Sequence, residues 1–407
     1  MKILSVNKFY WKKGGSESVF FNEKAMLEKG GHKVIPFSMN SDRNEPSPYS
    51  NYFVDEVDYE KSDLRNRLLS ASKIIYSFDA KSKMEKLLQD HSPNLAHFHI
   101  FQHQISPSVF GPLRKNNVPI ILTLHDLKPI CPNYKMYVNG NVCEQCKGRR
   151  FYNCFNNRCT KGSTLGSLVN TIEMYFHYAM GYYQGVDRYI AVSRFYKQKM
   201  MEAGFPEQQV DYLPNYIDAT AFDPQTADKG YMLYFGRLSE EKGISTFLDA
   251  SILNKEVPHL IVGTGPLEER LRQKVADGGL DNVRFLGFKQ GDELKTLLSE
   301  STCVVVPSEW YENCPMTVLE AFAAGRPVIG SDIGGIPELI EDGEDGFIFE
   351  PGNAQALAEK VQWIWEHRNK AREMGMQGRK KIEEQFNAEL HYNGLMSIYN
   401  SVLGNKK

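Results

Sequence analysis

The sequence lacks a large net charge, an apolar run long enough to cross a bilayer, and a secretory leader. Its 48 basic and 50 acidic side chains leave a net charge of -2, so no global field recruits nucleic acid. The longest apolar runs, such as Val118–Leu124, are only as long as strands. The apolar stretch at the N-terminus is too short for a signal peptide. These absences predict a soluble, cytoplasmic protein with no nucleic-acid partner.

The chain has 407 residues, too many for one ordinary core, which predicts two domains. Strand-like and helix-like stretches alternate almost throughout, as in α/β folds with parallel sheets. The strands expected in the first half are 2–7, 32–37, 95–100, 118–124 and 187–193. Those expected in the second half are 231–236, 258–265, 282–288, 302–308, 326–331 and 346–350. The sequence therefore predicts two doubly wound halves in series.

The best candidate for a linker between the halves is Leu213–Gly230, which is rich in Pro, Asp and Gly and has no clear period. The stretch 41–82 is polar and irregular, and the sequence assigns no element to it. Because ligands of open parallel sheets bind beyond the carboxyl ends of the strands, the residues that follow strands are the candidates for a site. With two such sheets, the natural site is the cleft between them.

Two candidates follow strands of the first half. Gly14, Gly15 and Glu17 end the loop after the first strand, where glycines permit positive φ and a helix start attracts anions. The alternative is an ordinary glycine turn. His125 follows Leu124 directly and could donate a hydrogen bond to a substrate hydroxyl or stabilise developing charge. The alternative is that His125 and Asp126 only organise a loop.

Two further candidates follow strands of the second half. Arg237 and Lys242 lie five positions apart and could hold a diphosphate, with Arg as a fork and Lys as a point charge. The alternative is a solvated charged turn. Gly263 and Gly265 form a G-x-G between a strand and a helix, where a ligand could approach the backbone. On its own, a G-x-G is a weak signal.

Two acids flank an expected helix start near the end of the chain. Pro315 suits the first helical position and Gly325 the helix end, so Glu312 precedes the helix and Glu320 lies inside it. The free amides near Met316–Val318 form an anion site. Glu320 suits a ribose diol, and Glu312 suits sugar hydroxyls or a developing cation.

In this order, the motifs resemble those of retaining glycosyltransferases of family 4, which have the GT-B fold. The motifs are Gly14–Glu17, His125, "GRLSEEKG", "VGTGP" and the two acids in an E-x7-E pattern, and "PNYID" resembles that family's "PNGVD" segment. The resemblance covers nearly the whole chain. It implies an acceptor-binding domain over 1–213, a nucleotide-sugar-binding domain over 214–386, and a terminal helix over 387–407 that crosses back to the first domain.

The resemblance also implies a role for each motif. Arg237 and Lys242 correspond to the pair that binds the donor diphosphate, together with Gly15 and the amides of Met316, Thr317 and Val318. Glu320, Gly263 and Gly265 correspond to nucleotide-binding positions. His125 and Glu312 correspond to groups beside the reacting sugar, and Gly14, Gly15 and Glu17 to the acceptor or phosphate loop.

The activity implied is retaining transfer of a sugar from a UDP- or GDP-linked donor to a glycan or lipid-linked acceptor. Such an enzyme (class EC 2.4) serves cell-surface polysaccharide or glycoconjugate synthesis and needs no cofactor for catalysis. The alternatives are a nucleotide-sugar epimerase of similar build and a binding partner without catalysis. The family often has Phe–Gly after the first acid, whereas this chain has Asn313–Cys314. Tyr216 replaces the glycine of "PNGVD".

Five of the seven cysteines fall in an insert over about 131–161. In a cytoplasmic protein, cysteines are thiols or metal ligands more often than disulfides. The spacing of Cys143, Cys146, Cys154 and Cys159 is compatible with a structural zinc site. The alternatives are free thiols or a disulfide formed by oxidation.

The same insert is basic and aromatic. Between Lys147 and Lys161 there are five cations and no acid, with Phe151, Tyr152 and Phe155 among them. One interpretation is peripheral contact with anionic lipid headgroups on the cytoplasmic face of a membrane. The other is a solvated loop that covers a core helix.

Overall fold

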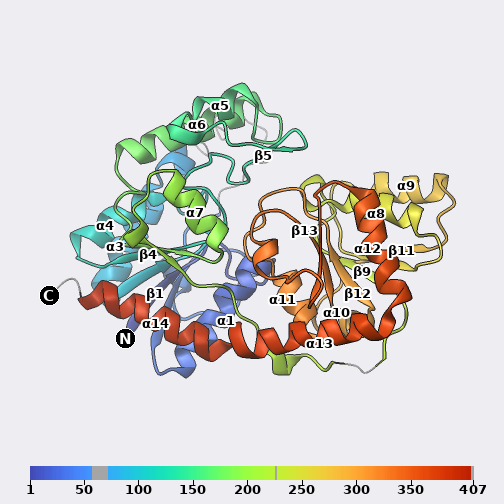
Figure 1. The fold of residues 1–407 in the computed structure, drawn as a ribbon. Helices are drawn as coiled ribbons and strands as arrows, with labels where there is room; N and C mark the ends of the chain where they lie inside the picture. Colours follow the sequence, from blue (N-terminus) through green and yellow to red (C-terminus); the bar gives the residue numbers. More distant parts are fainter. Residues whose placement is uncertain (57–71, 225–226, 405–407) are drawn as a thin grey trace. The chain divides into compact units, whose positions relative to one another are not determined.

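The computed structural model describes residues 1–56, 72–224 and 227–404, and contacts divide the chain into two compact units. Unit 1 comprises Met1–Met136, Cys143–Leu213 and Tyr392–Lys407. Unit 2 comprises Tyr137–Val142 and Pro214–His391. Each unit has a parallel sheet with helices on both faces (Figure 1), which confirms the predicted doubly wound α/β class. Residues 57–71 of the unassigned stretch 41–82 lie outside the described residues.

The sheet of unit 1 has six parallel strands in the order β2-β1-β3-β4-β7-β8. These strands are β1 (Lys2–Val6), β2 (Lys33–Phe37), β3 (Leu95–Phe98), β4 (Ile120–Leu124), β7 (Arg188–Ala191) and β8 (Val210–Tyr212). The helices of unit 1 are α1 (Gly15–Lys29), α3 (Phe78–His91), α4 (Phe110–Lys115), α5 (Tyr152–Asn156), α6 (Thr164–Ala179) and α7 (Arg194–Glu202).

The sheet of unit 2 has six parallel strands in the order β11-β10-β9-β12-β13-β14. These strands are β9 (Met232–Phe235), β10 (His259–Val262), β11 (Val283–Gly287), β12 (Cys303–Val306), β13 (Val328–Ser331) and β14 (Gly346–Phe349). The helices of unit 2 are α8 (Ile244–Leu253), α9 (Glu268–Asp277), α10 (Gly291–Glu300), α11 (Met316–Ala323), α12 (Ala354–Glu366) and α13 (Arg368–Gln385).

The last helix, α14 (Ala388–Gly404), packs into the core of unit 1. Leu395 and Tyr399 are fully buried there, beside Ile3 of β1, Leu95 of β3 and Ile121 of β4. These strands are short and apolar because helices cover both faces of a parallel sheet, and β4 is buried along its whole length. The C-terminal segment therefore completes the hydrophobic core that the first strands begin.

In unit 2 the strand order reverses between β9 and β12, and in unit 1 it reverses between β1 and β3. At such a point the loops leave neighbouring strands in opposite directions and open a crevice at the carboxyl edge. Arg237 and Lys242 follow β9, and Glu309–Glu312 follow β12. The fold therefore brings candidates from distant parts of the sequence to one edge of one sheet.

The predicted strands did not include β8 or the hairpin of β5 (Tyr137–Val138) and β6 (Asn141–Val142). The strands that were missed are short, and their polar or mixed sequences carry no clear period. Among the residues with a described structure, none of the helices combines the length and the apolar run needed to cross a membrane.

The loops after β9 and β12 approach so closely that one position excludes a side chain. Gly243 has a φ of +63°, and a Cβ added there would lie 1.6 Å from the carbonyl oxygen of Pro307. Gly352 has a φ of +76° but open space around it. We expect Gly352→Ala to cost about 1–2 kcal/mol of unfolding free energy, from the left-handed backbone alone. Gly243→Ala should cost about 3 kcal/mol or more, because overlap adds to that strain.

Urea unfolding of the two variants, compared with the unchanged protein, measures this difference. Equal losses of stability in the two variants would contradict the close approach of the two loops.

Candidate functional site

An ion pair joins the two strand-end loops of unit 2, with the Glu312 side chain buried and the Lys242 side chain 31% exposed. The Lys242 ammonium lies 2.6 Å from Oε1 of Glu312, and the Ser308 hydroxyl donates to the same oxygen at 2.7 Å. Backbone and side-chain bonds reinforce the contact: the Glu309 amide donates to the Glu241 carbonyl at 3.0 Å, and the Thr246 hydroxyl donates to Glu309 at 2.6 Å. The loops after β9 and β12 are therefore held together at the point of strand reversal.

Glu312 remains ionised in this setting. Burial alone would raise the pKa of its carboxyl, but the Lys242 charge and the hydrogen bonds from Lys242 and Ser308 lower it below its ordinary value. The Gly335 amide also donates to the backbone carbonyl of Glu312, at 2.8 Å. Glu312 is thus a junction of the loops after β9, β12 and β13, and its side chain is committed to Lys242.

Arg237, the other cation of the predicted pair, differs from Lys242. It is exposed, and its guanidinium has no ion pair or hydrogen bond to any residue that the structure describes. Its backbone is fixed, because its carbonyl accepts a hydrogen bond from the Tyr234 hydroxyl at 2.8 Å. The Arg237 guanidinium therefore has unused hydrogen-bond donors and lies on a turn with a fixed backbone at the carboxyl end of β9.

The helix after β12 begins one residue later than predicted. Pro315 is the N-cap of α11 rather than its first residue, with φ of -66° and ψ of 119°. Met316 and Thr317, as first-turn residues, have amides with no intrahelical acceptor. The Val318 amide already donates to the Pro315 carbonyl at 3.1 Å. Of the three amides predicted to bind phosphate, two are therefore available.

Glu320 lies one turn inside α11 and is half-buried. Burial raises the pKa of its carboxyl to about 7. No described residue forms an ion pair or hydrogen bond with that carboxyl. A half-buried acid without a protein partner suits a ligand that brings its own hydroxyl donors.

The structure gives Gly263 and Gly265 a packing role, and their predicted part in nucleotide binding stays a prediction. A Cβ on Gly263 would lie 1.9 Å from the Gly236 carbonyl, and one on Gly265 would lie 2.3 Å from the Leu238 carbonyl. The loop after β10 therefore packs backbone to backbone against the loop after β9. This packing explains both glycines without a ligand.

Unit 1 contains a cavity of about 270 Å³ beyond the carboxyl ends of its strands. Its lining includes Lys8, Lys13, Glu17, Gln102, His103, Asp126, Lys128 and Tyr134. Glu17 is 4% exposed and lies in the first turn of α1. Burial lowers the pKa of Lys8. Neither the Glu17 carboxylate nor the Lys8 ammonium has a hydrogen bond or close ion pair to a described residue, although the charges of Asp126 and Glu17 attract Lys8, which also lies over the Phe9 ring at 5.1 Å.

The glycines before Glu17 do not use the positive φ that the residue type permits. Gly14 is extended, with φ of -166° and ψ of -167°, and Gly15 begins α1 without a positive φ. A Cβ on Gly14 would lie 3.5 Å from Oε2 of Glu17, which is an ordinary van der Waals contact. A role for Gly14 and Gly15 in a phosphate or acceptor loop stays a prediction.

His125 lies at the carboxyl end of β4 and joins a buried chain of polar groups. Its Nε2 is 3.0 Å from Nδ1 of His99, and the two rings stack at 5.3 Å. Nε2 of His99 lies 3.5 Å from Glu23 of α1. Burial lowers the pKa of His125 to about 4, so its ring is neutral at neutral pH. Asp126 accepts from the Lys128 amide at 3.0 Å and organises the turn.

His97 extends this chain of polar groups to the C-terminal helix. Its Nδ1 is 2.8 Å from the Tyr399 hydroxyl of α14 and 3.6 Å from Glu23, and its Nε2 is 2.7 Å from the Thr123 hydroxyl. Sequence reasoning missed Glu23, His97 and Tyr399. The alternation His97-x-His99, in the expected strand 95–100, was the available signal, since it places both rings on one side of the extended chain.

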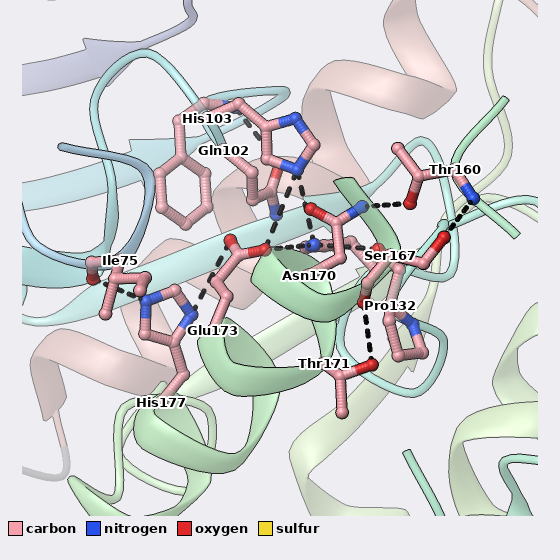
Figure 2. A network of polar contacts seen from close by, with 12 residues as sticks. Ile75, Gln102, His103, Pro132, Thr160, Ser167, Asn170, Thr171, Glu173 and His177 are labelled. Carbon is pink, nitrogen blue, oxygen red and sulfur yellow. Dashed lines mark hydrogen bonds and ion pairs between the residues drawn. The ribbon is translucent and has the colours of Figure 1, made fainter. Parts of the chain in front are cut away.

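A second buried network lies beside the cavity (Figure 2). The Lys128 ammonium donates to Glu173 of α6 at 2.6 Å and to the Pro132 carbonyl at 2.9 Å, and lies 3.3 Å from His103. Burial would raise the pKa of Glu173, but the charge of Lys128 lowers it below its ordinary value. Lys128 is therefore satisfied within the protein, unlike Lys8.

The cysteines of the insert are free thiols. A hydrogen bond from Cys159 lowers the pKa of Cys154, whereas burial raises that of Cys131 to about 12. Across the described part of the chain, Glu23, His97 and His99 form the one group of three or more candidate ligands within 4.8 Å of one another. The thiols of Cys143, Cys146, Cys154 and Cys159 lie near enough to influence one another's pKa but do not form such a group, so the zinc hypothesis stays a prediction.

Two family models match the chain and together cover most of it. Residues 13–221 match "Glycosyltransferase Family 4", and residues 219–381 match "Glycosyl transferases group 1". Among curated proteins, the amylovoran biosynthesis glycosyltransferase AmsK of Erwinia amylovora is 30% identical over 223 residues, which are 51% of this chain and 55% of AmsK. The chain spans about half the length of the first curated relatives it matches.

Two solved structures show the same fold over the whole chain. Sucrose-phosphate synthase from Thermosynechococcus elongatus superposes with a TM-score of 0.73, at 20% identity and 99% coverage of both chains. Anabaena HepE, solved in complex with UDP, superposes with a TM-score of 0.65 at 18% identity, over 98% of this chain and 100% of HepE. At these identities the likeness concerns the fold.

The raised pKa of Glu320 predicts how stability depends on pH. The folded protein holds this proton up to about pH 7, whereas the ordinary pKa is 4.5. The protonated Glu320 carboxyl therefore stabilises the folded protein fully below about pH 4.5, and this contribution is lost as the pH rises through 7. Glu320→Gln should raise the melting temperature by about 2–4 °C above pH 7 and by less as the pH falls toward 4.5.

Thermal melts from pH 5 to 8 test this, with Glu359→Gln on the exposed side of α12 as the matched control. If Glu320→Gln changes the melting temperature equally at every pH, or if the control changes it as much, the Glu320 proton is not the cause of the change.

Proposed function

The chain belongs to glycosyltransferase family 4, whose model matches just over half of it, and from this premise we propose that it transfers a sugar from a nucleotide-diphosphate sugar to a glycan or lipid-linked acceptor. The fold is GT-B, with two Rossmann-like units. The name of AmsK supports a role in cell-surface polysaccharide or glycoconjugate synthesis. The UDP bound to HepE supports a UDP- or GDP-linked donor. We further propose transfer with retention of configuration.

The observation that carries the proposal is the arrangement of charge at the strand reversal of unit 2. Arg237 offers a free guanidinium, and Lys242 keeps two donors besides the one it gives to Glu312. The amides of Met316 and Thr317 add the start of a helix. This is a set of donors suited to the two phosphates of a nucleotide sugar.

The two acids then have separate roles in the proposal. Glu320 accepts hydrogen bonds from the ribose diol, which supplies the donors that its half-buried carboxyl lacks in the protein. Glu312 holds Lys242 in place through the 2.6 Å contact. Its position beside the donor sugar remains part of the proposal.

The acceptor lies in the cavity of unit 1 in this proposal. Glu17 and Lys8 line that cavity with unused polar groups, and His125 stands at the end of the adjacent strand. Since His125 is neutral, it acts as a hydrogen-bonding group for a sugar hydroxyl rather than as a cation. No cofactor takes part in the proposed reaction. Peripheral contact with the cytoplasmic face of a membrane is compatible with a lipid-linked acceptor.

Incubation with a panel of UDP-, GDP- and ADP-sugars tests the function. Nucleoside diphosphate released faster with acceptor than without it marks a transferase. An isomerised donor would identify an epimerase, and binding without turnover would identify a partner without catalysis; either result overturns the proposal. The anomeric configuration of the product, read by NMR, tests retention.

In the same assay, Arg237→Ala should weaken nucleoside diphosphate binding roughly 10- to 100-fold, as expected for the loss of charged hydrogen bonds. Arg270→Ala is the matched control, because Arg270 is an exposed, unpaired arginine on α9 of the same unit. Near-normal binding and transfer by Arg237→Ala would remove the diphosphate assignment.

Glu23 and His99 act as positioning residues for His125. The Glu23 carboxylate, 3.5 Å from Nε2 of His99 and without a hydrogen bond to it, favours the Nε2–H tautomer of His99 electrostatically, and the Nδ1 lone pair of His99 then accepts from Nε2–H of His125. That bond leaves Nδ1 of His125 as an acceptor for a substrate hydroxyl. The contacts from α1, β3 and β4 thus fix both the tautomer and the direction of the ring.

We expect His99→Leu to lower kcat by up to about a hundredfold with the donor KM unchanged, because the His125 ring loses its fixed geometry. His99→Asn should recover part of kcat, since its side-chain amide can replace Nδ1. The control is His32→Leu, before β2 in the same unit. If His99→Leu and His99→Asn have equal kcat while the variants keep their melting temperatures, the positioning role is wrong.

A further inference from the structure

Helix α6 of unit 1 buries its polar face and exposes its apolar face, the reverse of the usual amphipathic helix. Its buried residues are mostly polar: Ser167, Asn170, Thr171, Glu173, Met174 and His177. Its exposed residues include large apolar side chains: Leu165, Leu168, Ile172 and Tyr175, with exposed fractions of 51, 39, 47 and 43%. In a soluble domain the apolar stripe of a helix normally faces the core. The exposed apolar side chains of α6 therefore do not contribute to the core of unit 1.

The inner face of α6 is fixed by the polar network described above. Figure 2 shows Glu173, Asn170 and His177 pointing from α6 to their partners in the interior. Asn170 donates to the Thr160 hydroxyl at 2.9 Å, and Nε2 of His177 lies 2.8 Å from the Ile75 carbonyl. Together with the Glu173–Lys128 pair, these bonds set the rotation of the helix. The apolar residues cannot turn inward without leaving buried polar groups unsatisfied.

The outward residues form one face and are extended by the neighbouring helix. Positions 165, 168, 172 and 175 are spaced by three, four and three, which places them along one stripe. Helix α5 packs against α6, with the Tyr152 amide 3.4 Å from the Tyr175 hydroxyl. Tyr152 and Phe155 of α5 add exposed fractions of 51 and 38%. We call these six residues the apolar face.

Cations are in excess along the segment that carries the apolar face, although Lys147 at its start pairs with Glu202 at 3.4 Å. From Lys147 to Met180 the sequence has five basic residues and one acid, Glu173, which is fully buried and paired with Lys128. Arg150, Arg158 and Lys161 are exposed, and none of them has a carboxylate partner within the described residues. A surface that combines exposed Leu, Ile and Tyr with unopposed Arg and Lys has the chemistry of a bilayer interface with anionic headgroups.

We propose that the apolar face of α5 and α6, with Arg150, Arg158 and Lys161, docks this protein on an anionic lipid bilayer. The apolar side chains enter the headgroup region, and the three cations contact lipid phosphates. A second copy fits less well, because a two-fold interface would place these cations against their own copies. The surface lies outside the residues proposed for donor and acceptor binding.

Co-sedimentation of the full-length protein with vesicles tests this docking, using phosphatidylcholine alone and phosphatidylcholine with about a third phosphatidylglycerol. The protein should partition to the anionic vesicles and be released by salt. Arg150→Gln/Arg158→Gln/Lys161→Gln should weaken partitioning by about fivefold per cation, or roughly a hundredfold in all. Leu168→Ser/Ile172→Ser should weaken it by about tenfold or more.

The matched controls lie in unit 2, where Leu253 and Phe288 are 53 and 63% exposed. Leu253→Ser/Phe288→Ser and Lys295→Gln/Arg270→Gln/Arg284→Gln should leave partitioning unchanged. All four variants should keep the melting temperature and the turnover of a water-soluble acceptor, which separates this proposal from that of the function.

Absence of binding to anionic vesicles overturns the docking, as does equal loss of binding in the control variants. A dimer in size-exclusion chromatography that Leu168→Ser/Ile172→Ser converts to monomer would assign the surface to a second copy instead.

Discussion

The contact between Lys242 and Glu312 is the constraint on which the candidate site depends. It joins the loops after β9 and β12 at the point where the strand order of unit 2 reverses, with Gly243 packed against the Pro307 carbonyl. Because the Glu312 carboxylate is buried, removing Lys242 would leave it as an uncompensated charge in the interior. These contacts fix the positions of Arg237 and of the start of α11, while the hydrogen-bond donors of both remain unused. Those donors are therefore available to a ligand.

Each unit contains charged side chains that are paired within the protein and others that have no such partner among the described residues. In unit 2, Lys242 is paired and Arg237 is free; in unit 1, Lys128 is paired with Glu173 while Lys8 remains available. Buried polar groups are costly unless they find partners, so those left without one at a cavity or strand end mark where a ligand completes the structure. In helix α6 the polar side chains find their partners in the interior, and the exposed apolar side chains are the ones left for an outside partner.

The strands and the strand-end positions of Arg237, Lys242, Glu312 and His125 were predictable, since buried parallel strands are short apolar runs and sites follow their carboxyl ends. What could not be predicted is pairing between distant segments. Glu23 and Tyr399 come from α1 and α14, and no local pattern links them to His97 of β3 and to His99 just after it. Pro315 was misjudged locally, because an N-cap and a first helical residue differ by one position.

A crystal structure with a bound nucleoside diphosphate tests the central claim most directly. The account predicts phosphate oxygens within hydrogen-bond distance of the Arg237 guanidinium and the amides of Met316 and Thr317, with the ribose hydroxyls on Glu320. The contact between Lys242 and Glu312 should persist. A diphosphate bound elsewhere, or a ribose that leaves Glu320 without a partner, would contradict the assignment of the site.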